Sequence, residues 1–268
     1  MDGFAKYLSA ELPVLQITWA RYFFTVIFTF PLMFFFFKKY LVWTDKPKLQ
    51  LIRGLILLTA NISFFYSISV ISLPKALTLA FVAPLVVTSF SPFFLGESVG
   101  FRRWTAVIIG FIGSLIVIRP GFVEINLASL AALGTGIMYG FYLIITRKLS
   151  SSDNPLLTLL LTGVVGAIIA TTFMPFVWVS PTFNQWSIMA AIGLFACIGH
   201  LFIILSLKYA DASKLAPFSY FEIVTNIIIA YYFFSDFPDS WTFLGLFIIV
   251  LSGIYISRRE NIVKNIKI

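Results

Sequence analysis

The sequence predicts an all-α membrane protein made of two inverted repeats of five helices each. Three observations support this prediction: the composition is too apolar for a water-soluble domain, apolar stretches near the length of a membrane span recur along the whole chain, and the layout of the first half returns in the second. Of the 268 residues, 60% are hydrophobic and 11% are charged, and the mean hydropathy is +0.98. Ordinary chains contain about 25% charged residues.

The apolar stretches predict nine visible spans, because about 20 helical residues cross a hydrocarbon core of roughly 30 Å. These runs are continuous and do not alternate as barrel strands do, so we expect helices, which satisfy their own backbone hydrogen bonds in lipid. The predicted spans are residues 13–37, 52–71, 76–95, 104–119, 127–146, 156–178, 186–207, 215–234 and 241–257.

The first residues of the chain are too few to span a membrane, and they lack the basic start and apolar centre of a signal peptide. We expect Asp2 to Leu8 to form the last turns of a helix whose beginning is absent. Two repeats of five helices would then appear as nine spans, with the first helix clipped.

The two halves match at a constant offset of 139 residues. The matched pairs are Lys75 and Lys214, Gly96 and Ser235, Trp104 and Phe243, Ser114 and Gly253, and Arg119 and Arg258. We expect a first repeat over residues 1–121, with its first helix truncated, a second over residues 127–260, and a cytoplasmic tail over residues 261–268. Matching helices are five spans apart, and an odd number of spans requires opposite orientations.

The basic residues predict the topology. Fifteen of the 19 lysines and arginines fall on one side of the predicted spans, from Lys38 and Lys39 to Lys264 and Lys267. This bias predicts a multi-pass protein of the bacterial cytoplasmic (inner) membrane with a cytoplasmic C-terminus. The net charge of +8 therefore reflects topology, and we expect the lipid bilayer and a small-molecule substrate as partners, and no nucleic acid. We expect a monomer or a homodimer.

The sequence offers little for catalysis. Cys197 is the only cysteine, which excludes an intrachain disulfide and a multi-cysteine metal site. No phosphate-binding loop, dinucleotide fingerprint or nucleophile elbow is present. We expect no enzyme, no cofactor and no metal.

Several motifs resemble those of the EamA-type transporters of the drug/metabolite transporter superfamily, and the resemblance covers nearly the whole chain. They are the stretches at residues 20–23, 83–85, 96–97, 216–222 and 236–239, with Gly110 and Gly113. Within the family, Ile52 to Gly54, Arg102 to Trp104 and residues 216–222 look most like bacterial S-adenosylmethionine uptake transporters. The resemblance implies the ten-helix inverted fold and transport of a small organic solute. Riboflavin and amino-acid exporters of the superfamily share much of this pattern, and the clipped start departs from it.

Glu222 is the strongest candidate site residue, because a carboxylate inside a predicted span costs roughly 2.5–3.5 kcal/mol on insertion scales and is usually kept for a purpose. Asn226 lies one turn further on the same face. Glu222 would balance a cationic substrate or carry a coupled proton. The alternative is a purely structural pairing with another helix.

Other polar and aromatic side chains in the spans are candidates for lining a substrate cavity. His200 and Asn61 match at the offset of 139, and Tyr139 and Tyr142 share a helical face with Thr135 and Thr146. Phe81 lies on a similar stripe of the predicted span 76–95. Tyr66 and Tyr220 have rings that could stack on a flat substrate or hold a sulfonium. Pro84 is a candidate hinge. The alternative for each is helix packing, interhelical hydrogen bonding or a static kink.

Together these features predict a secondary active transporter of a small organic metabolite that works by alternating access, with S-adenosylmethionine uptake implied by the resemblance. The alternatives within the superfamily are import or export of riboflavin, amino acids or other drugs and metabolites. From other classes, a non-transporting membrane subunit stays open, whereas a channel would need rings of charge or carbonyls, which the sequence does not show.

Overall fold

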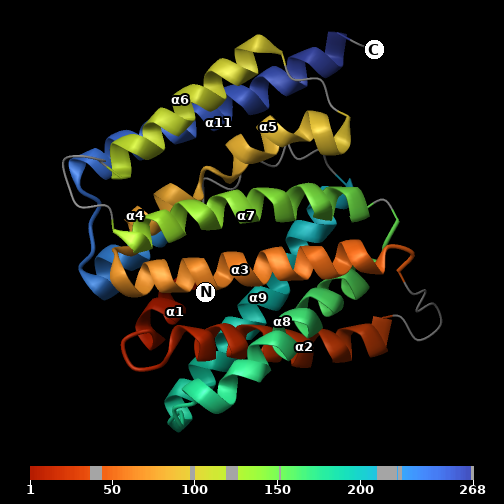
Figure 1. Ribbon diagram of the computed structural model, residues 1–268, viewed down its shortest axis with the longest axis vertical. Coiled ribbons are helices and arrows are strands. Elements are labelled where there is room, and N and C mark those ends of the chain that lie inside the picture. Colours follow the sequence, from red (N-terminus) through yellow and green to blue (C-terminus); the bar gives the residue numbers. More distant parts are fainter. Residues whose placement is uncertain are drawn as a thin grey trace. The chain divides into compact units, whose positions relative to one another are not determined.

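The computed structural model describes residues 1–36, 44–96, 100–118, 126–150, 152–209, 222 and 225–266. Within these ranges the chain forms helices and no strands (Figure 1). The helices are α1 (Asp2–Leu8), α2 (Val14–Phe36), α3 (Pro47–Val70), α4 (Leu73–Ala80), α5 (Ala83–Leu95), α6 (Phe101–Ile118), α7 (Leu127–Ser150), α8 (Pro155–Val177), α9 (Phe183–Tyr209) and α11 (Ser240–Ile266). Residues Thr225–Phe234 form a further apolar helix.

The predicted spans correspond to helices. In the described ranges, six helical stretches are long and apolar enough to cross a membrane: Val14–Phe35, Pro47–Val70, Leu73–Leu95, Leu127–Ser150, Pro155–Val177 and Phe183–Tyr209. Shorter apolar helices at Trp104–Ile118, Thr225–Phe234 and Ser240–Tyr255 fall within the other three predicted spans. The helical prediction and the multi-pass membrane prediction are therefore confirmed. Asp2–Leu8 is helical, as its sequence predicts.

The described chain separates into two compact units. Unit 1 comprises Met1–Phe65 and Ile145–Tyr209, and unit 2 comprises Tyr66–Ile144 and Ala210–Ile268. Neither unit coincides with a sequence half, because each takes helices from both. Unit 1 holds α1, α2, α8, α9, most of α3 and the end of α7, whereas unit 2 holds α4, α5, α6, α11 and most of α7.

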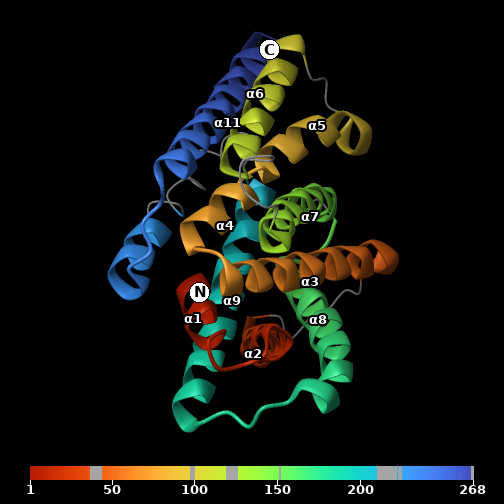
Figure 2. The ribbon, with the colours of Figure 1, turned by 60° about the vertical axis from the view of Figure 1, so that its left-hand side comes forward.

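Within each unit, two helices that match at the offset of 139 lie side by side and run antiparallel. In unit 2 these are α6 and α11, which have the most extensive contacts of any helix pair (Figure 2). A Cβ added to Gly110 would contact Ser252, and one added to Gly113 would contact Ile249, so the residue numbers rise along one helix as they fall along the other. Gly110 matches Ile249 and Gly113 matches Ser252 at the offset of 139, so the repeat converts each of these two contacts into the other, as an inverted repeat requires.

The same arrangement recurs in unit 1 with α2 and α8. Gly163 faces Val26, and Gly166 faces Tyr22, so these helices are antiparallel too. α9 packs against both of them, and α1 lies against α9, where the rings of Phe4 and Phe195 stack with centroids 6.1 Å apart. The inverted repeat predicted from span counting is thus visible in the packing of each unit.

Pro84 breaks a helix instead of bending it. The predicted span 76–95 is divided into α4 and α5 by a turn at Phe81 and Val82, and Pro84 lies in the first turn of α5. Proline has no N–H to donate to the carbonyl of Ala80, one turn back. Gly136 of α7 lies against this carbonyl, because an added Cβ there would sit 2.5 Å from the oxygen.

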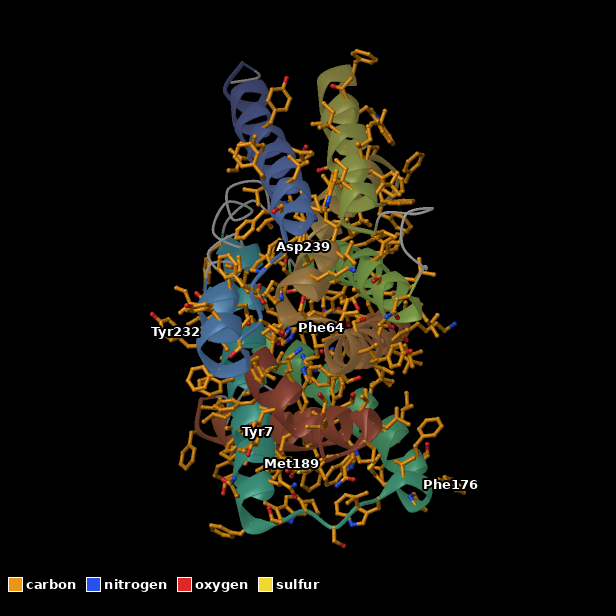
Figure 3. The ribbon with its side chains drawn as sticks, turned by 90° about the vertical axis from the view of Figure 1, so that its left-hand side faces the viewer. Tyr7, Phe64, Phe176, Met189, Tyr232 and Asp239 are labelled. Atoms are coloured by element: carbon orange, nitrogen blue, oxygen red, sulfur yellow. The ribbon has the colours of Figure 1, made fainter. Side chains whose placement is uncertain are left out.

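Large exposed side chains cover the helices as expected for lipid contact. Phe176 at the end of α8 is 83% exposed and Tyr232 is 75% exposed, and both rings point away from their helices (Figure 3). Met189 of α9, by contrast, is fully buried.

Candidate functional site

Two arginines are buried inside unit 1. Arg21 of α2 is 2% exposed and Arg53 of α3 is 0% exposed, which makes them the bulkiest fully buried side chains in the described part of the chain. Charged residues inside membrane segments are costly, and they usually pair with polar groups or mark a substrate pathway. The count of basic residues assigns Arg53 to a loop, whereas in the structure it lies in the second turn of α3 with its side chain buried.

Arg53 is held by neutral acceptors from two other helices. Its Nε donates to Thr146 Oγ1 at 2.7 Å, and its Nη1 donates to the Thr158 carbonyl at 3.1 Å and to Thr162 Oγ1. Gly54, the next residue, packs closely on Val165, since an added Cβ would lie 2.9 Å from the valine side chain. The Ile52 to Gly54 stretch therefore fixes α3 against α8.

Arg21 reaches across unit 1 to α9. Its Nη2 lies 2.6 Å from Nε2 of His200. A guanidinium only donates hydrogen bonds, so Nε2 is the acceptor and the neutral imidazole carries its proton on Nδ1. The Arg21 guanidinium carbon also lies 4.7 Å from the centre of the Tyr22 ring, within the range of a cation–π interaction.

Asn61 and His200, the two polar residues matched by the offset, are linked to neighbouring residues of α2. Asn61 is 8% exposed, and its Nδ2 donates to the Tyr22 hydroxyl at 2.9 Å and to the Leu57 carbonyl at 2.6 Å. His200 accepts from Arg21. The structure thus brings both candidates into one polar cluster in unit 1, in which Arg21, Tyr22 and Asn61 are buried and His200 is half-buried.

The predicted polar stripe on α7 divides between the two units. Tyr139 and Tyr142 belong to unit 2, where their rings stack with centroids 5.4 Å apart and an interplanar angle of 18°. Tyr142 is fully buried and Tyr139 is half-buried. Thr135 donates to the Ala131 carbonyl at 3.0 Å, as in ordinary helix packing. Thr146 belongs to unit 1, where it receives the hydrogen bond from Arg53.

The remaining candidates also lie in unit 2. Phe81 occupies the turn between α4 and α5 and is 8% exposed, and Tyr66 is half-buried near the end of α3. Asn226 is 6% exposed, and its Nδ2 donates to the Glu222 carbonyl at 3.0 Å. The side chain of Glu222 itself is exposed. Tyr220 lies outside the described residues.

A solved structure shares this fold. A protein of known crystal structure superposes with a TM-score of 0.69 over 95% of this chain and 92% of its own, at 17% sequence identity. At that identity the likeness concerns the fold alone.

Sequence relatives are transporters. The S-adenosylmethionine uptake transporter of Rickettsia felis is 27% identical over 97% of this chain and 88% of its own length. The riboflavin transporter of Vibrio cholerae is 30% identical over 70% of this chain and 63% of its own, and the pseudopaline exporter CntI of Pseudomonas aeruginosa is 25% identical over 97% and 92%. The EamA-like transporter family model matches twice, at residues 3–119 and 126–258. The chain belongs to the EamA-like transporter family.

Proposed function

We propose that this chain takes up S-adenosylmethionine across the bacterial cytoplasmic membrane by alternating access, as a secondary transporter with its C-terminus in the cytoplasm. The observation that carries the proposal is the reach of the similarity. Uptake transporters of this substrate from four Rickettsia species match 97% to 99% of the chain at 26% to 27% identity. The pseudopaline exporter matches 97% at 25% identity, and the riboflavin transporters match 70% or less. The positive-inside bias of the loops supports the orientation.

In this proposal different candidate residues contact different chemical groups of the substrate. Glu222 and Asn226 face the positively charged sulfonium and amine, and Tyr220 and Tyr66 offer rings for cation–π contact. Tyr139 and Tyr142 form a stacked pair, and an adenine ring placed at one end of this pair would extend the stack. Phe81 is a further aromatic candidate, three residues before Pro84.

The broken helix α4–α5 supports a role for Pro84 as a hinge. Proline removes one hydrogen bond across the turn at Phe81 and Val82, so the two helical pieces can change their angle at lower cost than a continuous helix. The energy for transport would come from a gradient or from exchange, since the sequence contains no nucleotide-binding loop.

A riboflavin transporter is the second candidate, favoured by the higher identity of 30% over the part that matches. Thermal-shift measurements on the purified protein separate the two. We expect S-adenosylmethionine to raise the melting temperature in a saturable manner, and riboflavin, neutral amino acids and polyamines to leave it unchanged. Stabilisation by riboflavin alone would replace the proposed substrate with the alternative.

A further inference from the structure

The Arg21 guanidinium is incompletely satisfied. Its Nε has no hydrogen-bond partner although the atom is buried. Among the described residues Arg21 forms no ion pair, and the buried carboxyl of Asp2 acts on it only at longer range. A buried unpaired donor costs about 1–3 kcal/mol, and more when it belongs to a charged group. Charged residues inside membrane segments pair with other groups or mark substrate pathways.

The unsatisfied atom lies on the edge of the guanidinium that binds carboxylates. The Nε–H and one Nη2–H point the same way from the planar group, and together they form the fork that takes two carboxylate oxygens. Nη2 donates one hydrogen bond to Nε2 of His200 at 2.6 Å, and Nε donates none. At least one of the two donors of the fork is therefore unused. Because Nη2 carries two protons, it can serve His200 and a carboxylate oxygen together.

The surroundings favour an anion over any other ligand. The positive charges of Arg21 and Arg53 both act on the imidazole of His200. The hydrogen bonds described for Arg53 go to two hydroxyls and a carbonyl. Arg21 and Arg53 thus place two positive charges near one neutral imidazole, which favours an anionic ligand.

We propose that the Nε–Nη2 edge of Arg21, supported by His200, binds a free carboxylate on the transported solute. This inference rests on the proposed transport function, because an anion reaches a residue that is 2% exposed only when the chain opens. It adds the substrate class: the solute must carry a carboxylate, as an α-amino acid group does.

The test compares two ligands that differ only in this group. Binding of S-adenosylmethionine and of decarboxylated S-adenosylmethionine is measured on the purified full chain by thermal shift or calorimetry. Loss of a charge-assisted hydrogen-bonded pair predicts at least tenfold weaker binding of the decarboxylated compound, roughly the factor expected for bonds to charged groups. Equal binding of both ligands would overturn the inference and leave the proposed function intact.

Substitutions of Arg21 test whether this residue causes the preference for S-adenosylmethionine over its decarboxylated form. In Arg21→Gln, and also in Arg21→Lys, which keeps the charge but loses the fork, we expect the preference for the carboxylate to fall to about threefold or less. Arg53→Lys is the matched control, since Arg53 is equally buried but its Nε already has the Thr146 hydroxyl as a partner. The control variant should keep the full preference. An undiminished preference in both Arg21 variants would overturn the assignment.

A further arm separates failure of this inference from failure of the proposed function. If neither S-adenosylmethionine compound binds, the proposed substrate is wrong, and amino acids are then tested against their amides as matched pairs. Stabilisation by at least one acid and not by its amide, lost in Arg21→Lys, supports the carboxylate site for another substrate. Stabilisation by none of the acids, or by acids and amides alike, refutes it.

Discussion

Ser235 adopts a backbone conformation that suits glycine. Its φ is +53°, and Gly96, its match at the offset of 139, has a φ of +68°. Both residues end an apolar helix, and the N–H of Ser235 donates to the Tyr231 carbonyl at 3.2 Å, as in an αL cap. The repeat therefore preserves a helix end whose left-handed residue is glycine in one half and serine in the other.

Replacing Ser235 with glycine should stabilise the protein. A non-glycine residue in this region costs about 1–2 kcal/mol, and glycine gives back about 0.5–1 kcal/mol through its greater freedom in the unfolded chain. We expect a net gain of up to about 1 kcal/mol, seen as a higher melting temperature. Ser187→Gly, at an exposed helix-interior position, should lower it. A fall of similar size in both variants would contradict the helix-end interpretation.

Glu222 tests the electrostatics of the proposed substrate. Glu222→Gln keeps the size and removes the negative charge, so binding of a cationic substrate should weaken by about tenfold or more, or transport should lose its dependence on protons. Asp239→Asn is the control, since Asp239 instead accepts from the N–H of Thr242 at the start of α11. Unchanged binding and unchanged proton dependence in Glu222→Gln would refute both roles.

At the level of helices, α2 and α9 are held together by close contact at glycine. An added Cβ on Gly193 would lie 2.2 Å from the Cβ of Phe24 and 3.0 Å from two of its backbone carbons. Nothing lies within 4 Å of a Cβ on Gly199, two turns further along α9. Gly193→Ala should destabilise unit 1 by about 1–3 kcal/mol through overpacking, whereas Gly199→Ala should be neutral or stabilising. Thermal unfolding of the two variants checks this, and equal effects would contradict the packing of α2 on α9.

Asp153 links the segment before α8 to the start of α3 through hydrogen bonds. Its carboxylate accepts from Thr44 Oγ1 at 2.6 Å, Gln50 Nε2 at 2.7 Å and Ser152 Oγ at 2.9 Å. Burial alone would raise the pKa of Asp153, but these hydrogen bonds and the charge of Lys46 outweigh it and hold the pKa below the ordinary value of 3.8. The ionised carboxylate is therefore the form that stabilises this junction.

The pH dependence of stability follows from that direction. A depressed pKa contributes stability above the unfolded pKa, and this contribution is lost as the pH falls through the folded value. Asp153→Asn should lower the melting temperature at neutral pH, and the difference from the unchanged protein should shrink as the pH falls below 3.8 and through the lowered pKa of the folded state. A difference that stays constant over this range would show that the carboxylate charge plays no part.

For the whole molecule, the sequence was sufficient to predict the fold, whereas the candidate site stays a prediction. Counting spans between Lys75 and Lys214 predicts inversion, and the antiparallel packing of α6 on α11 confirms it. The composition of the two units could not be predicted, because the offset shows which helices correspond and not which ones pack together. The polar match of Asn61 with His200 predicts that the two are related, but their link through Tyr22 and Arg21 depends on side-chain contacts across helices.

Arg53 shows where sequence patterns mislead. An arginine near the start of a predicted span reads equally well as a loop residue, and only the threonine acceptors on α7 and α8 show that it is buried. Gly54, the next residue, packs closely on Val165 of α8, which agrees with the inward side of α3 at this point.

Uptake of labelled S-adenosylmethionine by bacterial cells that produce this chain tests the proposed transport. We expect time-dependent, saturable accumulation above cells that lack the chain, reduced by excess unlabelled S-adenosylmethionine and unaffected by riboflavin. Accumulation no greater than in the cells that lack it, with the protein shown to be present in the membrane, would refute S-adenosylmethionine uptake.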